Sequence, residues 1–291
     1  MNLQVIFNGV VSGLVLAVLA LSFSLVYLPT RVFHIALAGI VTLVPYVAMS
    51  SLKHDMPWWL AGGLALLAAL AVSLMCEAIN HRRLERKQAS SGAHIMVSLG
   101  VYIIITQIVA MFWGNDVQIL RMGVGKTFKI GSVLISQAQG VSAGVALVLL
   151  IGVFGWLRYS SLGLRFRALA DNSVEFGLCE YNVNHYRLLA FGVSGLMGGV
   201  AALLTAYDVG FDPHGGLHVL ILAVVSVIIG GRSTFLGPVL GGLLLGVLRS
   251  QVVWHFSARW QDVFTFLLLA LFLYVRPNGI RGRASRLEAS E

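Results

Sequence analysis

Long apolar stretches alternate with short polar ones along the whole chain, and this alternation predicts a bundle of membrane-crossing helices. The first stretch, Leu3–Leu28, contains no charged residue and is long enough to cross the hydrocarbon core of a bilayer. Further stretches follow at Val32–Leu52, Trp58–Cys76, His94–Trp113, Val141–Leu157, Leu188–Tyr207, Leu217–Ile229, Gly237–Leu248 and Val263–Val275. We therefore expect an all-α, polytopic integral membrane protein with about 8–9 transmembrane helices.

Two regions depart from this pattern. The apolar stretches within the glycine-rich segment 217–248 are short for complete spans, so this segment either crosses the membrane as two short helices or forms a re-entrant pair. The region Gly114–Gln139 is polar and contains glycine, and part of Phe128–Ile135 alternates apolar and polar residues as a strand does. A small hairpin is expected there.

The composition excludes a soluble domain. Hydrophobic residues make up 58% of the chain and charged residues 11%, whereas soluble proteins carry about 25% charged residues. Residues 1–291 are expected to form a single transmembrane domain without a cleaved signal peptide, because the first apolar run is too long for one. The net charge of +8 does not indicate a nucleic-acid partner, since the basic residues cluster between apolar runs.

The positions of Lys and Arg predict the orientation. If the basic patch Glu77–Lys87 is cytoplasmic, alternation places the loop 158–187 and the basic tail 276–291 on the same side. Together with Arg31 and Arg232, that side then holds 14 of the 20 Lys and Arg residues, and the opposite side holds five. Basic residues accumulate on the cytoplasmic side of membrane proteins. The amino terminus is therefore expected outside and the carboxyl terminus in the cytoplasm, and a re-entrant pair would not change this parity.

The loop 158–187 has the pattern of two short helices. Leu164, Ala168 and Leu169 recur at helical spacing with arginines between them, which predicts an amphipathic helix. Asn172, with Glu175 three residues later, resembles a capping box that starts a second helix. Three interpretations compete: an ordinary solvated loop, a helix lying on the lipid surface, and a rigid element that docks into a cytoplasmic partner. Acidic residues among the arginines weaken the second interpretation.

The sequence offers no enzyme chemistry that we can recognise. It contains no His-Glu-x-x-His or Cys-x-x-Cys motif, and Gly125-Lys126-Thr127 lacks the upstream glycine of a phosphate-binding loop. We expect no catalytic, cofactor-binding or metal-binding residues, and no disulfide between Cys76 and Cys179. Glu77 adjoins the basic patch and is interpreted as an interfacial residue. His34 and His218 are interpreted as packed, hydrogen-bonded pore or interface residues and not as metal ligands. A partner is expected to supply the energy for any transport.

Four ordered motifs resemble those of the permease subunits of bacterial branched-chain amino-acid ABC importers, the LivH-like family. They lie at Gly163–Asn172 with Glu175, Leu178 and Tyr181–Val183, at Phe191–Ala202, at Asp212–Gly216 followed by Ile229–Gly246, and at Arg276–Gly279. The match covers Gly163–Gly282, and the amino-terminal half agrees in hydropathy and in its Asn8-Gly9 to Ser12-Gly13-Leu14 opening.

The resemblance implies a transport subunit, not an enzyme, that forms the translocation path for a small solute, most of all a branched-chain or other amino acid. It implies a multi-pass location in the bacterial inner membrane. The implied partners are a second permease subunit, either the same or different, two cytoplasmic ATP-binding subunits, and a periplasmic solute-binding protein.

The implied functional residues fall into two sets. Coupling to the ATPase is expected from the loop residues Gly163, Arg165, Arg167, Ala168, Asp171, Asn172 and Glu175. The candidate pore or helix-packing residues are His34, Gly195, Gly199, Gly230, Gly231, Gly237, Pro238, Gly241, Gly242 and Gly246. Small residues spaced four apart, as in Gly195-x-x-x-Gly199, allow helices in a membrane to approach closely.

One departure from the family pattern bears on the solute. Where the family has an Asn-Phe-Ala-His-Gly-like run, this chain has His34-Ile-Ala-Leu-Ala38. Related permeases for urea, amides or aromatic acids are therefore an alternative. An alternative of another class is a channel or secondary carrier that works without ATP, for which Val11–Leu14 and Val193–Leu196 would be traces of an internal repeat. A membrane scaffold that transports nothing is a third possibility.

Overall fold

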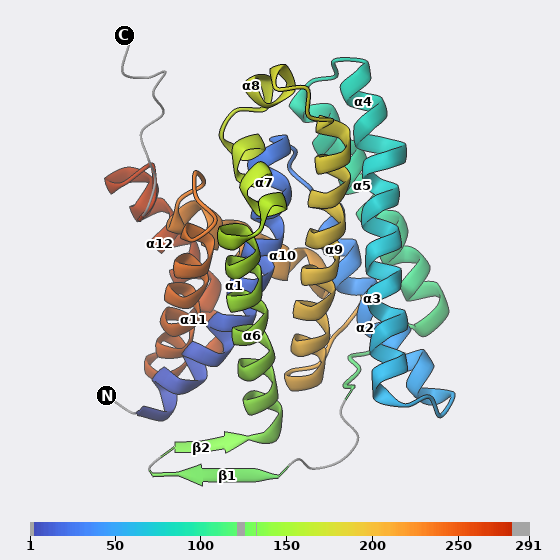
Figure 1. The fold of residues 1–291 in the computed structure, drawn as a ribbon. Helices are drawn as coiled ribbons and strands as arrows, with labels where there is room; N and C mark the ends of the chain where they lie inside the picture. The colour runs from blue at the N-terminus through green and yellow to red at the C-terminus, as the bar shows by residue number, and fades with distance from the viewer. Residues whose placement is uncertain (1–2, 121–125, 132, 281–291) are drawn as a thin grey trace. The chain divides into compact units, whose positions relative to one another are not determined.

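The computed structural model describes residues 3–120, 126–131 and 133–280, which fold into helices and one short hairpin (Figure 1). The α-helices are α1 (Leu3–Thr30), α2 (Ala36–Lys53), α3 (Trp58–Met75), α4 (Arg82–Arg86), α5 (Ser91–Trp113), α6 (Gln137–Tyr159), α7 (Ser161–Asp171), α8 (Ser173–Leu178), α9 (Val183–Asp208), α10 (Gly215–Gly230), α11 (Gly237–His255) and α12 (Gln261–Val275). A π-helix, η1 (Cys76–His81), joins α3 to α4, and a 3-10 turn, η2 (Ala258–Trp260), precedes α12. The strands are β1 (Thr127–Ile130) and β2 (Val133–Ser136).

Eight helical segments in the described part of the chain are long and apolar enough to cross a membrane, which confirms the all-α polytopic class. α10 is shorter: its 16 residues extend about 24 Å, against a hydrocarbon core of about 30 Å. α11, in contrast, is long enough for a span. Only one of the two stretches within 217–248 is thus short.

The predicted hairpin is confirmed. β1 and β2 pair antiparallel, with Phe128 opposite Ile135 and Lys129 opposite Leu134. The side chain of Gln4, near the start of α1, extends the pairing, because its Nε2 donates to the Leu134 carbonyl oxygen at 2.9 Å and its Oε1 accepts from the Leu134 amide at 2.7 Å. The hairpin is therefore attached to α1.

Several helices have limits other than those expected from hydropathy. α2 begins at Ala36, not at Val32, because Arg31 has a left-handed φ of 56° and ends the first helix. The third span continues past Cys76 through η1 and α4 to Arg86, so the basic patch is helical and not a loop. α11 extends to His255, and its Arg249 is paired with Asp262 of α12 at 2.8 Å, so the charge does not interrupt the helix.

The contacts divide the chain into two compact units. The first unit consists of the described residues within 1–24, 124–147 and 221–291, and the second of those within 25–123 and 148–220. In the first unit, Val225, Ile229 and Leu245 form a buried cluster between α10 and α11, against which leucines of α12 pack. In the second unit, α2, α3, α5 and α9 pack together, and their largest buried side chains include Tyr46 and Phe191.

Hydrogen bonds also connect the helices within the second unit. The Ser73 hydroxyl on α3 donates to the carbonyl oxygen of Phe191 on α9 at 2.6 Å. The amide of Ala36, at the start of α2, donates to the Ser98 hydroxyl on α5 at 2.7 Å. Both contacts use small side chains, which bring the helix backbones close together.

Candidate functional site

α7 is an amphipathic helix with a defined start. Ser160 has extended backbone angles, and its hydroxyl accepts a hydrogen bond from the Leu162 amide at 3.2 Å, which satisfies one of the free donors of the first turn. Its inner face buries Gly163, Phe166 and Leu169. The spacing of three residues between these positions keeps them on one side of the helix. Of the residues whose spacing predicted the helix, only Leu169 lies on this face, because Leu164 and Ala168 are exposed.

α8 begins directly after the predicted capping residue. Asn172 is extended, with φ −148° and ψ 105°, and its Oδ1 accepts a hydrogen bond from the Glu175 amide at 3.3 Å. The predicted helix restart at Asn172 is confirmed. The cap lets the chain turn between α7 and α8 without a long linker, which holds the two short helices as one body.

α7 and α8 both pack against the start of α9. Leu169, Phe176 and Tyr186 form a buried cluster, and the rings of Phe176 and Tyr186 pack edge to face with centroids 5.2 Å apart. Arg165 donates a hydrogen bond to the Tyr186 hydroxyl at 3.3 Å and lies over the Tyr181 ring. The hydrogen bond raises the pKa of Arg165 above its usual value, so its guanidinium remains charged.

Six of the seven predicted coupling residues are exposed. They are Arg165, Arg167, Ala168, Asp171, Asn172 and Glu175. Gly163 differs: it is buried, and an added Cβ there would lie 2.7 Å from Leu157 Cα on α6, so a close backbone approach requires this glycine. Leu164 and Leu178 are 59% and 79% exposed on the same pair of helices. The outer side of α7–α8 therefore combines charges, one small residue and exposed leucines.

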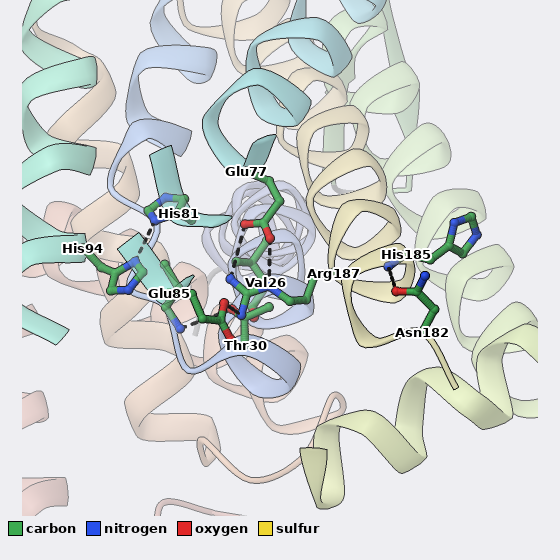
Figure 2. Close-up of polar contacts among 10 residues, drawn as sticks. Val26, Thr30, Glu77, His81, Glu85, His94, Asn182, His185 and Arg187 are labelled. Atoms are coloured by element: carbon green, nitrogen blue, oxygen red, sulfur yellow. Dashed lines mark hydrogen bonds and ion pairs between the residues drawn. The ribbon is translucent and has the colours of Figure 1, made fainter. Parts of the chain in front are cut away.

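A buried polar network lies next to this cluster, at the start of α9, and Figure 2 shows its members. Arg187 donates from Nε to Glu77 Oε1 at 2.7 Å and from an NH2 nitrogen to Glu77 Oε2 at 3.4 Å. It also forms an ion pair with Glu85 of α4. The side chains of Arg187 and Glu77 are 4% and 1% exposed, and that of Glu85 is 51% exposed.

Three histidines continue the network in the second unit. His81 Nδ1 lies 3.0 Å from His94 Nδ1, which joins η1 to α5 (Figure 2). His34 is fully buried, with its ring centroid 5.7 Å from that of His81 and 4.8 Å from that of Phe191. Neither ring nitrogen of His34 has a hydrogen-bond partner within the described residues. His34 is thus packed, but without the hydrogen bonds that a buried imidazole ordinarily makes.

This network was not predicted from the sequence. The hydropathy pattern indicated an interfacial Glu77 and placed Arg187 in a loop, whereas both are buried and paired. One signal was present: Val183, Arg187 and Phe191 are four residues apart, so Arg187 lies on the same stripe of α9 as two apolar residues. No such spacing marks the partner Glu77.

The predicted glycines of α9 lie where the helix meets α3. An added Cβ at Gly195 would lie 3.0 Å from the Ala69 carbonyl oxygen, and one at Gly199 would lie 3.0 Å from Ala69 Cβ. These glycines therefore lie at a helix contact within the second unit. Beside them, a groove of about 740 Å³ between α3 with η1 and α9 is lined by apolar side chains together with Gly192 and His185. Its lining lacks the several polar groups that a small polar ligand needs for orientation.

The other predicted glycines lie in the first unit. An added Cβ at Gly237 would lie 2.6 Å from the Gly230 carbonyl oxygen, and one at Gly241 would overlap the Ser226 carbonyl, so α10 and α11 are in backbone contact. Gly231 has a φ of 111°, which other residues rarely adopt. Pro238 is buried in the first turn of α11. Gly242 and Gly246 face α1: an added Cβ at Gly242 would lie 2.7 Å from Ala17 Cα.

One sequence in α6 has the spacing of a catalytic motif but not its context. Gly140-Val-Ser-Ala-Gly144 matches the Gly-x-Ser-x-Gly spacing of serine hydrolases, in which the serine occupies a tight turn between a strand and a helix. Here the segment lies inside a helix and Ser142 is buried. Among the described residues, no group of three or more His, Cys, Asp and Glu side chains is arranged to hold a metal ion, and Cys76 and Cys179 are both free.

Comparison with known proteins identifies the family. The family model described as the branched-chain amino acid transport system permease component matches residues 5–273. The chain belongs to this family. It is 27% identical to the high-affinity branched-chain amino acid transport system permease protein LivH of Salmonella typhimurium, over 97% of this chain and 96% of that protein. It is 26% identical to the corresponding protein BraD of Pseudomonas aeruginosa, again over 97% and 96%.

One solved structure has a similar fold. PsaBC from Streptococcus pneumoniae, solved in complex with a Fab, resembles this chain with a TM-score of 0.53, 11% sequence identity, and coverage of 97% of this chain and 94% of that one. At this identity the likeness shows the fold alone. The family membership and the eight apolar helices together identify the chain as a multi-pass membrane permease of a transport system, as the four sequence motifs predicted.

Proposed function

We propose that this chain is the membrane-spanning subunit of an ABC importer and forms the path for a small amino acid together with a second permease subunit. Two cytoplasmic ATP-binding subunits supply the energy, and a periplasmic binding protein delivers the solute. The observation that carries the proposal is the family match over residues 5–273, which includes the whole of α7–α8 and the network beside it.

The exposed face of α7–α8 is the proposed docking surface for the ATPase. Its support is physical: the inner face is fixed on α9 by Leu169, Phe176 and Tyr186, while the charged residues and Ala168 of the outer face are exposed. Two capped short helices on a rigid cluster transmit force better than a flexible loop, because few backbone angles can change between the contact and the membrane. The solvated-loop interpretation does not account for this packing.

The proposed orientation has the amino terminus outside and the carboxyl terminus in the cytoplasm of a bacterial inner membrane. The 14 to 5 distribution of Lys and Arg supports it. It places α7–α8, η1 and α4 on the cytoplasmic side, and the hairpin β1–β2 on the side from which a binding protein delivers solute.

The proposed solute is a branched-chain or similar amino acid. The names of LivH and BraD support this class, since both align over nearly their whole length. The segment His34-Ile-Ala-Leu-Ala38 departs from the family pattern, and a different solute preference is expected to arise there if there is one. The transport test therefore also includes urea, amides and aromatic acids.

The test is transport by vesicles with a defined energy source. The chain is purified with the subunits that co-elute with it, reconstituted with ATP inside, and supplied with its binding protein and labelled leucine, urea, acetamide or benzoate. Uptake of leucine that requires internal ATP and survives collapse of ion gradients is expected. ATP-dependent uptake of another solute alone would correct the solute, and accumulation driven by a proton or sodium gradient without ATP would overturn the ABC proposal.

A further inference from the structure

Two neighbouring residues of α9 bind different parts of the second unit. Tyr186 lies in the cluster with Leu169 of α7 and Phe176 of α8. Arg187, the next residue, points to the other side and binds Glu77 of η1 and Glu85 of α4. Both belong to the first turns of one helix, which has a capped start at Asn182. A displacement of α7–α8 that moves Tyr186 therefore also moves Arg187.

The segment that Arg187 holds, 76–86, differs from the helix before it. α3 is fixed to α9 by the Ser73 to Phe191 hydrogen bond and by the glycine contacts of α9. After Met75 the helix becomes the π-helix η1, where the regular pattern of hydrogen bonds changes, and such turns are frequent at functional sites. Beyond that point, Arg187 of α9 and His94 of α5 contact the segment through side chains. The segment is thus attached to α9 and α5 through these side-chain contacts, whereas α3 is also held by close contact with the glycines of α9.

The two carboxylates that bind Arg187 are unequal. Glu77 is 1% exposed and binds the guanidinium through two hydrogen bonds, whereas Glu85 is 51% exposed. The Glu85 carboxylate is half in water and is rehydrated when its contact breaks, but Glu77 and Arg187 cannot separate without leaving a buried unpaired charge. Arg187 therefore has one permanent and one exchangeable partner.

Stability alone does not explain a buried ion pair at this place. Replacing such a pair with well-packed apolar side chains is often neutral or stabilising, because the pair loses its hydration on burial. What the pair provides is direction: the guanidinium fork fixes the relative position of the two helices that it joins. A role in position, and not only in packing, fits the geometry better.

We propose that Arg187 is the positioning residue that links the coupling helices to segment 76–86. When α7–α8 move, Arg187 releases Glu85 to water and keeps Glu77, and η1 and α4 change position against α5. This inference rests on the proposed docking of the ATPase to α7–α8, and it adds the residue through which that movement reaches the rest of the second unit.

The first test changes the exchangeable partner. Glu85→Gln keeps the shape of a half-exposed side chain, so the protein should fold, and Arg86→Gln is the control on the same helix because Arg86 is exposed. The complex with ATPase and binding protein is reconstituted, and solute uptake per ATP hydrolysed is measured. We expect this ratio to fall about fivefold for Glu85→Gln, a typical coupling between linked sites, and to stay at the wild-type value for Arg86→Gln.

The second test removes the permanent pair without leaving a buried charge. Glu77→Met with Arg187→Met should assemble with the ATPase and hydrolyse ATP, while uptake per ATP falls by about tenfold or more. A merely structural pair would instead lower uptake and hydrolysis in proportion to the amount of assembled complex. If the double variant fails to assemble, the uptake per ATP hydrolysed by Glu85→Gln alone tests the role of Arg187.

The outcomes separate this inference from the proposed function. Wild-type ratios in both Glu85→Gln and the double variant, at normal ATPase co-purification, overturn the role of Arg187 and leave the importer intact. A wild-type protein that neither binds an ATPase nor transports with ATP overturns the proposed function, and this inference with it.

Discussion

At the scale of single residues, the contact between α1 and α11 depends on the absence of side chains. An added Cβ at Gly246 would lie 2.5 Å from the Gly9 carbonyl oxygen and would overlap the backbone of Gly13. Backbone atoms cannot rotate away as the end of a flexible side chain can. Gly246 is therefore fixed by its neighbours in the first unit.

We predict that Gly246→Leu destabilises the protein by roughly 1–3 kcal/mol or more, the usual cost of overpacking a close contact. Gly144→Leu is the matched control, since an added Cβ at Gly144 in α6 has no atom within 4 Å in the described structure. The measurement is the thermal unfolding midpoint of each purified variant in the same detergent. Equal midpoints for the two variants would show that the α1–α11 contact is looser than the structure indicates.

Glycines at close helix contacts could be predicted in part from the sequence. The spacing of Gly237, Gly241, Gly242 and Gly246 indicated close helix contacts, because small residues four apart share one helix face. Which helix each glycine meets was not accessible, since that depends on tertiary packing. Arg187 was harder still: its charge suggested a loop in water, and only its partner Glu77, 110 positions away in the chain, explains its burial.

At the scale of elements, α7 and α8 show where local rules suffice. The helical spacing of α7 and the Asn172 cap are local signals, and both helices form, although the buried face of α7 is Gly163, Phe166 and Leu169 and not the predicted one. Hydropathy was less informative at helix ends. The span α3–η1–α4 continues through charged residues to Arg86, because arginine, leucine and glutamate are good helix formers. The helix ends just before Gln88, whose φ of 49° is left-handed.

We predict that Ala168→Trp uncouples the permease from its ATPase without unfolding it. Ala168 is exposed, so a larger side chain can extend into solvent, but it would obstruct a partner that fits closely against α7. Ala258→Trp is the control, an exposed alanine expected on the opposite side of the membrane. ATPase co-purification should fall at least about tenfold for Ala168→Trp, since a clash at a buried contact costs over about 1.4 kcal/mol.

The comparison is made at matched amounts of permease in the membrane. Ala258→Trp should retain the wild-type amount of ATPase. If Ala168→Trp retains it as well, α7 does not face the ATPase, and the solvated-loop interpretation of 158–187 is restored.

At the scale of the whole molecule, the division into two compact units could not be predicted from the sequence. Three of their boundaries fall within α1, α6 and α10, where no change in composition marks them, and the fourth falls in the polar segment between α5 and β1. The class and the family were accessible, because apolar length and ordered motifs are properties of the chain itself. The division into units was not, since it depends on contacts between segments far apart in sequence.

The orientation is the molecular property that a single labelling experiment can test. Cys179 lies exposed beside α8, on the expected cytoplasmic side, whereas Cys76 is buried. His54 is exposed between α2 and α3, on the expected outer side, so His54→Cys in a Cys179→Ser background provides the opposite reporter. A membrane-impermeant maleimide should label Cys179 of the wild type in inside-out vesicles alone, and the His54→Cys variant in right-side-out vesicles alone. The reverse pattern would place α7–α8 outside, where no ATP-driven subunit could reach them, and would overturn both the orientation and the coupling role of these helices.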